Sequence, residues 1–427
     1  MYLIKFSFIL FISNILQYLY SIADIIFISH FESDNAVAAL GNCASLMFVI
    51  TSISVGLSIG GAVVISKYKG AKDYIKYKQS IGSLLFLSLI SSLIISLLGL
   101  IFYKQILTFM NIPKEAFNYA CDYIKIIFTG IILIFLYSSL YSVIKASSKE
   151  KVSLCFILIA ALTNIILDFV FVYILKLSVK GAALATVISQ ALSFLLSLFY
   201  TRKIISFNIN SSILKELIFT SFPCIFQILI INISYFAVNI MMNKYDVIAG
   251  FTIGLKINTF IGIISWSYGE ALSILTAKSL GERNYKKIKD NVISALFFNI
   301  LTTALAIIFI HLFAKNIINI FYSGNEKTVN DIILYLRVCA SFNGIIYALM
   351  YMLDSFLIGI QKSYLSFINA AIDSVFFKII ISIILEKHIG FFGIYLSMAF
   401  SPIVPAFIGI IYFLIFIKKH RLYLFKD

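Results

Sequence analysis

The sequence predicts an all-α polytopic membrane protein with twelve transmembrane helices, and three observations support this fold class. Hydrophobic residues make up 61% of the chain and charged residues only 12%, whereas soluble globular chains are about one quarter charged. The mean hydropathy is +1.01, which implies more apolar surface than a soluble protein can hide. The apolar residues also fall into long runs that are separated by short, lysine-bearing loops.

Twelve of these runs reach the length of about 20 apolar residues that a membrane-spanning helix requires. The first run has no secretory cleavage site and is expected to remain as a helix. Because the number of spans is even, both termini are expected on the same side of the membrane. The predicted spans cover residues 4–29, 36–62, 81–103, 116–143, 154–175, 179–201, 216–241, 248–273, 291–313, 329–358, 366–385 and 392–417.

Lysine and arginine residues are concentrated in every second loop. These loops and the C-terminal tail carry about 20 basic residues, against about 8 in the other loops, so the positive-inside rule places both termini in the cytoplasm. The same distribution explains the net charge of +15 without a nucleic-acid partner. We therefore expect a multi-pass protein of a bacterial plasma or inner membrane.

A short motif occurs twice, about half a chain apart. The loop after the second run reads Gly70-Ala-Lys-Asp-Tyr, and the loop after the eighth run reads Gly281-Glu-Arg-Asn-Tyr. Such a repeat predicts two pseudo-symmetric six-helix bundles in the same orientation, an arrangement that transporters use for alternating access. The predicted division is an N-lobe of residues 1–203, a cytoplasmic linker of residues 204–215 and a C-lobe of residues 216–427.

Few ionisable residues lie within the runs, where each costs about 2.5–3.5 kcal/mol to insert. Asp24 lies in the first run, and Asp168 in the fifth run follows Asn164 by one helical turn, so that both share a helix face. At about 1.5 Å per residue, Asp168 lies about 24 Å along its span and Thr186 about 12 Å from the opposite surface. With Asp24 and Tyr123 near the ends of their spans, all five groups are expected in the outer half of the first bundle.

These five side chains predict a site for a small cation. Their carboxylate, amide, hydroxyl and phenol oxygens are hard ligands that suit H+ or Na+, and Na+ would be held by Asp24, Asn164, Asp168 and Thr186. Two carboxylates in a dry site cannot both stay ionised cheaply, so the site would take up a cation and release it on opening to water. Polar residues such as Asn164 and Thr186 are also typical of contacts between helices, and Tyr123 of an interface anchor.

The second half has other charged residues within its runs. Lys256 and Asp354 lie deep enough to line a cavity or to pair with other groups. Glu270, Arg337 and Asp373 lie near predicted helix ends, where long or flanking side chains reach water. The residues that the repeat aligns with the Asn-x-x-x-Asp pair of the first half are apolar, so no second pair of this kind is expected.

Motifs of other functional classes are absent from the sequence. There is no Walker A motif, which excludes direct use of ATP by that route, and there is no HExxH or GxSxG motif of an enzyme. The five cysteines and four histidines are scattered singly, so neither disulfides nor a metal or redox cofactor is expected. We expect a secondary transporter of a small organic molecule, not an enzyme, with no cofactor beyond a coupling ion.

In their order and spacing, the motifs resemble the multidrug and toxic compound extrusion (MATE) family, and most closely its DinF-like and bacterial drug-efflux branches. The resemblance covers nearly the whole chain. It rests on Ala23-Asp24-Ile-Ile-Phe-Ile, Gly56-Leu-Ser-Ile-Gly60, Asn164-Ile-Ile-Leu-Asp168, the segment Val179–Gln190, and Leu280-Gly281-Glu-Arg-Asn.

The resemblance implies a V-shaped pair of bundles around a central cavity. It implies antiport, in which H+ or Na+ enters as an organic, often cationic, compound leaves. It also implies that Asp24, Asn164, Asp168 and Thr186, with Tyr123, form the cation site of the first lobe. We expect a monomer in the lipid bilayer, driven by the ion gradient.

Two departures from the family pattern and two rival functions qualify this interpretation. The first span has no proline, so bending of that helix at a proline is not expected, and Asn232 and Ser234 stand where another branch has a glutamate of a second-lobe sodium site. The alternative function is a lipid-linked glycan flippase of the same superfamily, with Lys256 facing the phosphates. A non-transporting scaffold would not need buried carboxylates that converge.

Overall fold

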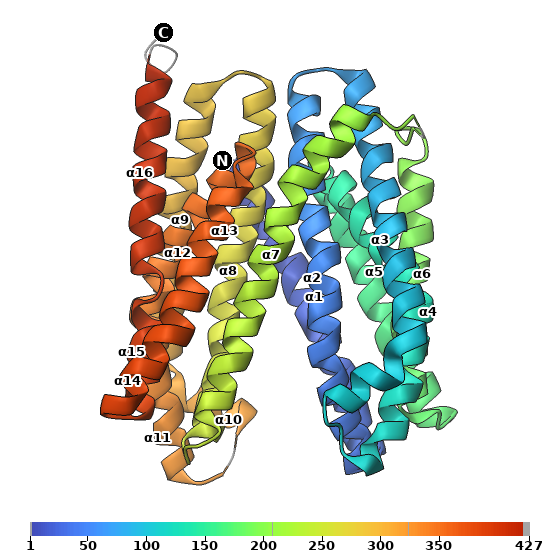
Figure 1. Ribbon diagram of the computed structural model, residues 1–427, viewed down its shortest axis with the longest axis vertical. Coiled ribbons are helices and arrows are strands. Elements are labelled where there is room, and N and C mark those ends of the chain that lie inside the picture. Colours follow the sequence, from blue (N-terminus) through green and yellow to red (C-terminus); the bar gives the residue numbers. More distant parts are fainter. Residues whose placement is uncertain (1, 207, 323, 422–427) are drawn as a thin grey trace. The chain divides into compact units, whose positions relative to one another are not determined.

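The computed structural model describes residues 2–206, 208–322 and 324–421, and their side chains except those of residues 20–26, 29, 30 and 34. Every regular element in these ranges is a helix (Figure 1). Twelve helical runs in the described part of the chain are long and apolar enough to cross a membrane, and each corresponds to a predicted span. The predicted all-α fold class with twelve spans is confirmed.

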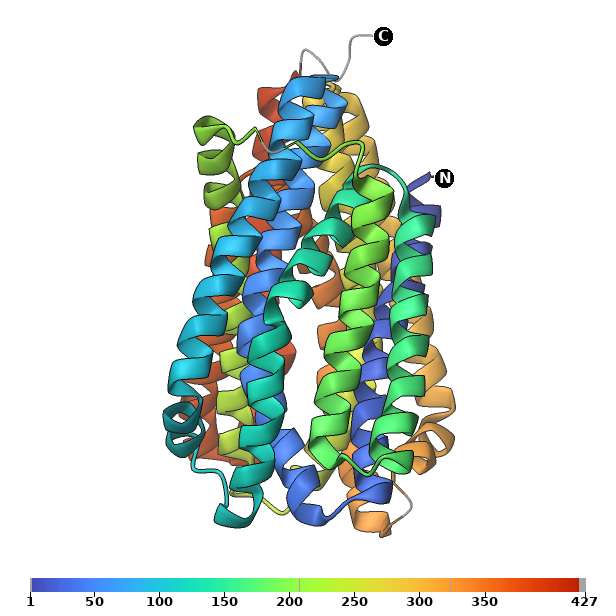
Figure 2. The ribbon, with the colours of Figure 1, turned by 90° about the vertical axis from the view of Figure 1, so that its right-hand side faces the viewer.

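The first six spans follow one another through short turns, and the fifth continues from an α-helix into a π-helical segment. Figure 2 shows α4, α5 and α6, coloured from teal to green, running alongside one another. The elements are α1 (Tyr2–Phe31), α2 (Asp34–Gly70), α3 (Tyr74–Phe109), α4 (Lys114–Ala146), α5 (Glu150–Asp168), the π-helical segment η1 (Phe169–Ile174) and α6 (Ser178–Thr201).

The last six spans include two further π-helical segments, one in the tenth span and one in the eleventh. A short helix, α10, lies between the ninth and tenth spans. The elements are α7 (Ser211–Met242), α8 (Ile248–Gly281), α9 (Tyr285–Leu312), α10 (Ala314–Phe321), α11 (Glu326–Tyr335), η2 (Leu336–Phe342), α12 (Asn343–Gly359), α13 (Ser363–Ala371), η3 (Ile372–Ile381), α14 (Ser382–Ile389), α15 (Phe391–Phe400) and α16 (Ile403–Lys419).

The chain forms two compact units. The N-unit comprises Ile12–Ile225, and the C-unit comprises Met1–Phe11 together with Phe226–Asp427. Helix α7 begins at Ser211, so the last residues of the segment predicted as a linker, 204–215, are helical.

The duplicated loop motif has the same local structure in both halves of the chain. Asp73 accepts a hydrogen bond from the backbone N–H three residues later, at 3.0 Å, and caps α3; Asn284 does the same at 2.9 Å and caps α9. The residue before each cap has a positive φ angle, 55° at Lys72 and 54° at Arg283. The sequence repeat therefore corresponds to a repeated turn between two long helices.

Large apolar side chains lie on the outside of the helices. On α3, Ile94, Leu97 and Ile101 are 52%, 60% and 62% exposed. Soluble proteins rarely show contiguous apolar surface of this kind, whereas the hydrocarbon of a bilayer covers it. Several hydroxyl groups within the spans donate to the helix backbone, as Thr201 does to the Ser197 carbonyl one turn earlier at 2.6 Å.

Candidate functional site

Four of the five residues predicted to bind a cation have described side chains, and all four lie in the N-unit. Tyr123 is on α4, Asn164 and Asp168 are on α5, and Thr186 is on α6. The fifth residue, Asp24, is on α1, and its side chain lies outside the described residues. Helix α6 packs against α4, α5 and η1, so three of the four elements that carry these residues are neighbours.

The Asn164–Asp168 pair is fully buried at the end of α5. The two residues are 1% and 0% exposed. Among the described residues, no group forms a hydrogen bond with the side-chain amide of Asn164. Because leaving a buried polar group without a partner costs about 1–3 kcal/mol, this amide is where a bound ion or water would be stabilised.

A change of helix type follows Asp168 directly. Helix α5 ends at this residue and the chain continues as η1, in which Leu175 N–H bonds to the carbonyl of Val170 at 2.9 Å. π-Helical turns are rare and occur frequently at functional sites, because they shift the side chains that follow them. The acidic residue of the pair therefore lies at the junction between two helical geometries.

Two glycines allow α6 to approach both neighbours closely. A Cβ atom at Gly181 would lie 3.0 Å from the backbone of Phe171 in η1, and a Cβ atom at Gly130 of α4 would lie 2.4 Å from the side chain of Val187. Phe171 follows Asp168 by three residues and Val187 adjoins Thr186. Helix α6, which carries Thr186, is therefore packed closely against η1, which follows Asp168, on one side and against α4 on another.

Tyr123 belongs to the core that surrounds this end of the N-unit. Its side chain is 9% exposed and is part of one hydrophobic cluster with Val172 of η1, Val179 of α6 and Ile28 of α1. Ile28 lies one helical turn beyond position 24, so α1 enters the same core. The end of the unit where the cation site was predicted is thus a closed, largely apolar region around a few buried polar groups.

The C-unit contains a second group of buried charged residues. The Asp354 carboxylate, on α12, is 1% exposed and accepts a hydrogen bond from the Asn369 amide at 2.7 Å. Asp373 and Lys378 are 2% and 3% exposed and form an ion pair of 2.6 Å within η3. The Lys378 ammonium also lies 4.9 Å from the ring centroid of Tyr235 on α7, within the range of a cation–π interaction.

The structure corrects two expectations about this group. Asp373 does not reach water, because it is buried against Lys378. The second half does contain an Asn-x-x-x-Asp pair, formed by Asn369 and Asp373 in the eleventh span. The repeat did not align it with the first pair because Asn369 lies about two turns from the start of its span, whereas Asn164 lies about four turns from the start of α5.

The two residues predicted to line a cavity differ in their surroundings. Lys256 is exposed on α8. Asp354 is buried and bonded to Asn369, as described above. The ion pair of Asp373 with Lys378 and the ring of Tyr235 were missed at the sequence level. A search for the Asn-x-x-x-Asp spacing along each helix would have found Asn369 and Asp373, but it gives no signal for Lys378 or Tyr235.

Comparison with known proteins places this chain in a family. A family model described as MatE matches residues 10–170 and 223–384. The probable multidrug resistance protein YoeA of Bacillus subtilis is 24% identical over 334 residues, which cover 74% of this chain and 72% of the relative. The multidrug export protein MepA of Staphylococcus haemolyticus is 28% identical over 300 residues, which cover 68% of this chain and 66% of the relative.

A solved structure shows the same fold at low sequence identity. The crystal structure of MATE in the bent conformation has a TM-score of 0.92 at 22% identity, covering 99% of this chain and 96% of that one. The family model covers parts of both halves of the chain, including both Asn-x-x-x-Asp pairs. The resemblance found in the motifs is therefore confirmed, and the chain belongs to the MatE family of membrane transporters.

Proposed function

We propose that this chain is a secondary antiporter that exports small organic, cationic compounds in exchange for H+ or Na+. Membership of the MatE family and the export functions named for its relatives support transport of this kind. The observation that carries the proposal is the buried Asn164–Asp168 pair, which offers a carboxylate and an unsatisfied amide at membrane depth.

The chemistry of this pair explains how a cation would be bound and released. Burying a charged carboxylate is costly in a medium of low dielectric, so a proton or Na+ bound at Asp168 stabilises the state in which the site is closed to water. The amide oxygen of Asn164 supplies a further hard ligand, and Asp24, Tyr123 and Thr186 complete the proposed set. When the site opens to water, hydration of the carboxylate favours release of the ion.

Exchange follows if the ion and the organic compound favour different conformations of the transporter. Each ligand shifts the equilibrium only by its differential affinity for the two states. The coupling is reciprocal, so an ion that lowers the affinity for the exported compound is itself displaced by that compound. A cationic substrate suits this scheme, because it and the coupling ion are alternative counter-charges for the same acidic region.

We assign the coupling ion to the N-unit because the two Asn-x-x-x-Asp pairs differ at the asparagine. Asp373 is neutralised by Lys378 at 2.6 Å, and Asp354 accepts a hydrogen bond from Asn369 at 2.7 Å. In the N-unit, by contrast, the amide of Asn164 has no hydrogen-bond partner among the described residues.

The proposal is tested by measuring efflux of a fluorescent cationic dye from proteoliposomes under an imposed pH gradient or an imposed Na+ gradient. Asp168→Asn should strongly weaken the response to the gradient that drives the wild type. Asp246→Asn, at a side chain that is 91% exposed, is the matched control and should transport as the wild type does. Equal gradient-driven efflux in Asp168→Asn and the wild type would overturn the mechanism, and dye retention unaffected by the wild-type protein would favour the flippase alternative.

The same proposal includes the topology. With the basic loops inside, both termini lie in the cytoplasm, as the positive-inside rule predicts. A reporter fused to the C-terminus that is active only in the cytoplasm should be active, and the same reporter in the loop around Asn35 should be inactive. The reverse pattern would overturn the assignment.

A further inference from the structure

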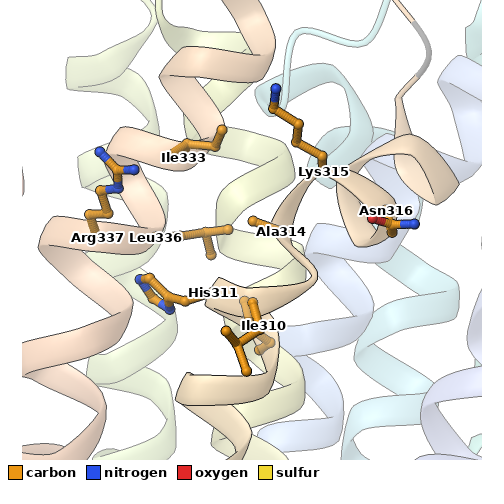
Figure 3. Close-up of a pocket in the computed structure, with 9 residues that line it drawn as sticks. Ile310, His311, Ala314, Lys315, Asn316, Ile333, Leu336 and Arg337 are labelled. Carbon is orange, nitrogen blue, oxygen red and sulfur yellow. The ribbon is translucent and has the colours of Figure 1, made fainter.

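A basic cavity lies in the C-unit, at the end of the ninth span. Its volume is about 300 Å³, and it is lined by side chains of α9, α10, α11 and η2. Figure 3 shows His311 and Arg337 side by side at one edge of the cavity and Lys315 extending past the other. The cavity is not part of the predicted cation site, which lies in the N-unit.

The polar lining of the cavity carries positive charge without a carboxylate. Its polar residues are His311, Lys315, Asn316 and Arg337, and the remaining lining residues are apolar. Over the described ranges, neither Lys315 nor Arg337 forms an ion pair, although other lysines of the C-unit do. Two permanent cations that share a cavity and have no acidic partner provide a site for an anion.

His311 is held in position by hydrogen bonds at both ring nitrogens. Nδ1 lies 2.9 Å from the carbonyl of Ile307 and therefore carries a proton, while Nε2 lies 3.0 Å from the hydroxyl of Ser341. Because the Ser341 hydroxyl also reaches the Leu336 carbonyl at 3.2 Å, it can accept from Nε2–H while donating to that carbonyl. The contacts thus fix the orientation of the imidazole ring at the edge of the cavity.

The surroundings of the cavity indicate that it lies at the membrane surface. Helix α9 ends at Leu312, one residue after His311. Leu312, Phe313 and Ile320 are 74%, 46% and 79% exposed, while Ile318 packs inward and Lys315 projects from the same short helix. Exposed apolar residues beside a lysine on a short amphipathic helix are typical of segments that lie among lipid headgroups.

We propose that this cavity binds a phosphate group, and that the phosphate belongs to the headgroup of an anionic lipid. Arg337 matches phosphate oxygens with a planar pair of donors and Lys315 adds a point charge, while the apolar walls and the exposed Leu312 and Phe313 contact the glycerol and acyl chains. Basic pockets between transmembrane helices bind phospholipid headgroups on the cytoplasmic side of membranes. Under the topology proposed above, this cavity would offer the same chemistry to lipids of the outer leaflet. This inference does not depend on the coupling mechanism proposed above.

The test compares lipid binding by the full-length protein and by variants of the cavity. Purified protein is titrated with phosphatidylglycerol and, separately, with phosphatidylcholine, and bound lipid is measured by native mass spectrometry. Arg337→Gln and Lys315→Gln should each weaken phosphatidylglycerol binding about fivefold, and Arg337→Lys should restore part of the loss. Lys327→Gln, at a lysine 68% exposed on α11 and outside the cavity, is the matched control and should bind as the wild type does.

A second arm separates a lipid from free phosphate as the source of the anion. Inorganic phosphate is added at constant ionic strength to protein in phosphatidylcholine nanodiscs, and the unfolding temperature is compared with that in discs that contain phosphatidylglycerol. The proposal expects stabilisation by phosphatidylglycerol and none by phosphate, and loss of that stabilisation in the variant with both Arg337→Gln and Lys315→Gln. Equal stabilisation by phosphate would identify the free ion as the ligand, and equal phosphatidylglycerol binding by that variant and the wild type would overturn the site altogether.

Discussion

The two Asn-x-x-x-Asp pairs occupy the fifth spans of the two halves and adjoin π-helical segments, yet their charges are balanced differently. In the N-unit, Asn164 and Asp168 are buried where α5 meets η1. In the C-unit, Asn369 bonds to Asp354, and Asp373 is paired with Lys378 inside η3. In the C-unit, the acidic residue of the motif is therefore neutralised by a lysine side chain. In the N-unit, we propose that an exchangeable ion neutralises it.

The π-helical geometry of η3 explains how the lysine reaches its partner. Lys378 follows Asp373 by five residues. In an α-helix, residues three and four apart are neighbours and a residue five apart points away, but a π-helix bonds each residue to the fifth one along. A local change of helix type thus brings two residues that are five apart into a buried ion pair.

The largest effect expected from this comparison is the loss of stability on removal of the Lys378 ammonium, the fixed cation of the C-unit. Lys378→Met should lower the free energy of unfolding by about 3–5 kcal/mol, because it leaves the Asp373 carboxylate buried without a counter-charge. The double variant Lys378→Met with Asp373→Asn should recover most of that loss. Thermal unfolding of the purified proteins measures both, and a single variant as stable as the wild type would show that the pair does not stabilise the fold.

The next largest effect on stability is expected from the hydrogen bond between Asn369 and Asp354. Asn369→Ala removes the donor that Asp354 accepts from at 2.7 Å. Because leaving a buried polar group without its hydrogen-bond partner costs about 1–3 kcal/mol, a loss of that size is expected. Asn164→Ala is the matched substitution in the N-unit; it removes an amide with no described partner and should cost distinctly less stability. Equal losses at the two positions would mean that the Asn164 amide has a structural partner.

For transport, the larger effect is expected in the N-unit, although the larger effects on stability are expected in the C-unit. Asp168→Asn should reduce the coupling between the ion gradient and dye efflux by about 5- to 150-fold, the range of a coupling free energy of 1–3 kcal/mol. Its unfolding temperature should change little, because the amide has the shape of the carboxylate and carries no charge to bury. Efflux and thermal unfolding of the same preparation test both parts, and a large loss of stability without loss of coupling would assign Asp168 a structural role.

The fold was accessible from the sequence because hydropathy and loop charge are properties of contiguous residues. Each predicted span has a helical counterpart, and the motif around Gly70 and Gly281 identified the repeat. The first Asn-x-x-x-Asp pair was found for the same reason, since α-helical periodicity relates its members. Burial of both members was expected from their depth in the fifth span.

The rest depended on geometry that periodicity does not encode. The ion pair of Asp373 with Lys378 required a π-helix, and nothing in the residue types of η3 distinguishes it from an α-helix at the sequence level. The cavity at His311, Lys315 and Arg337 required three separate segments to meet around the end of α9. Both features depend on three-dimensional structure, which the pattern of residues along a single helix does not predict.

The smallest effect expected concerns an exposed ion pair, which sets a baseline for the buried one. Asp122 of α4 and Lys180 of α6 lie 3.2 Å apart with both side chains about half exposed. Asp122→Asn should therefore cost only about 0.2–1 kcal/mol in unfolding free energy, because water and salt screen the pair. Added salt should reduce even that difference, whereas the effect of Lys378→Met should persist, since a buried charge is screened much less. If the two substitutions were equally sensitive to salt, the pair in η3 would be accessible to solvent, and the contrast between a fixed and an exchangeable cation would lose its physical basis.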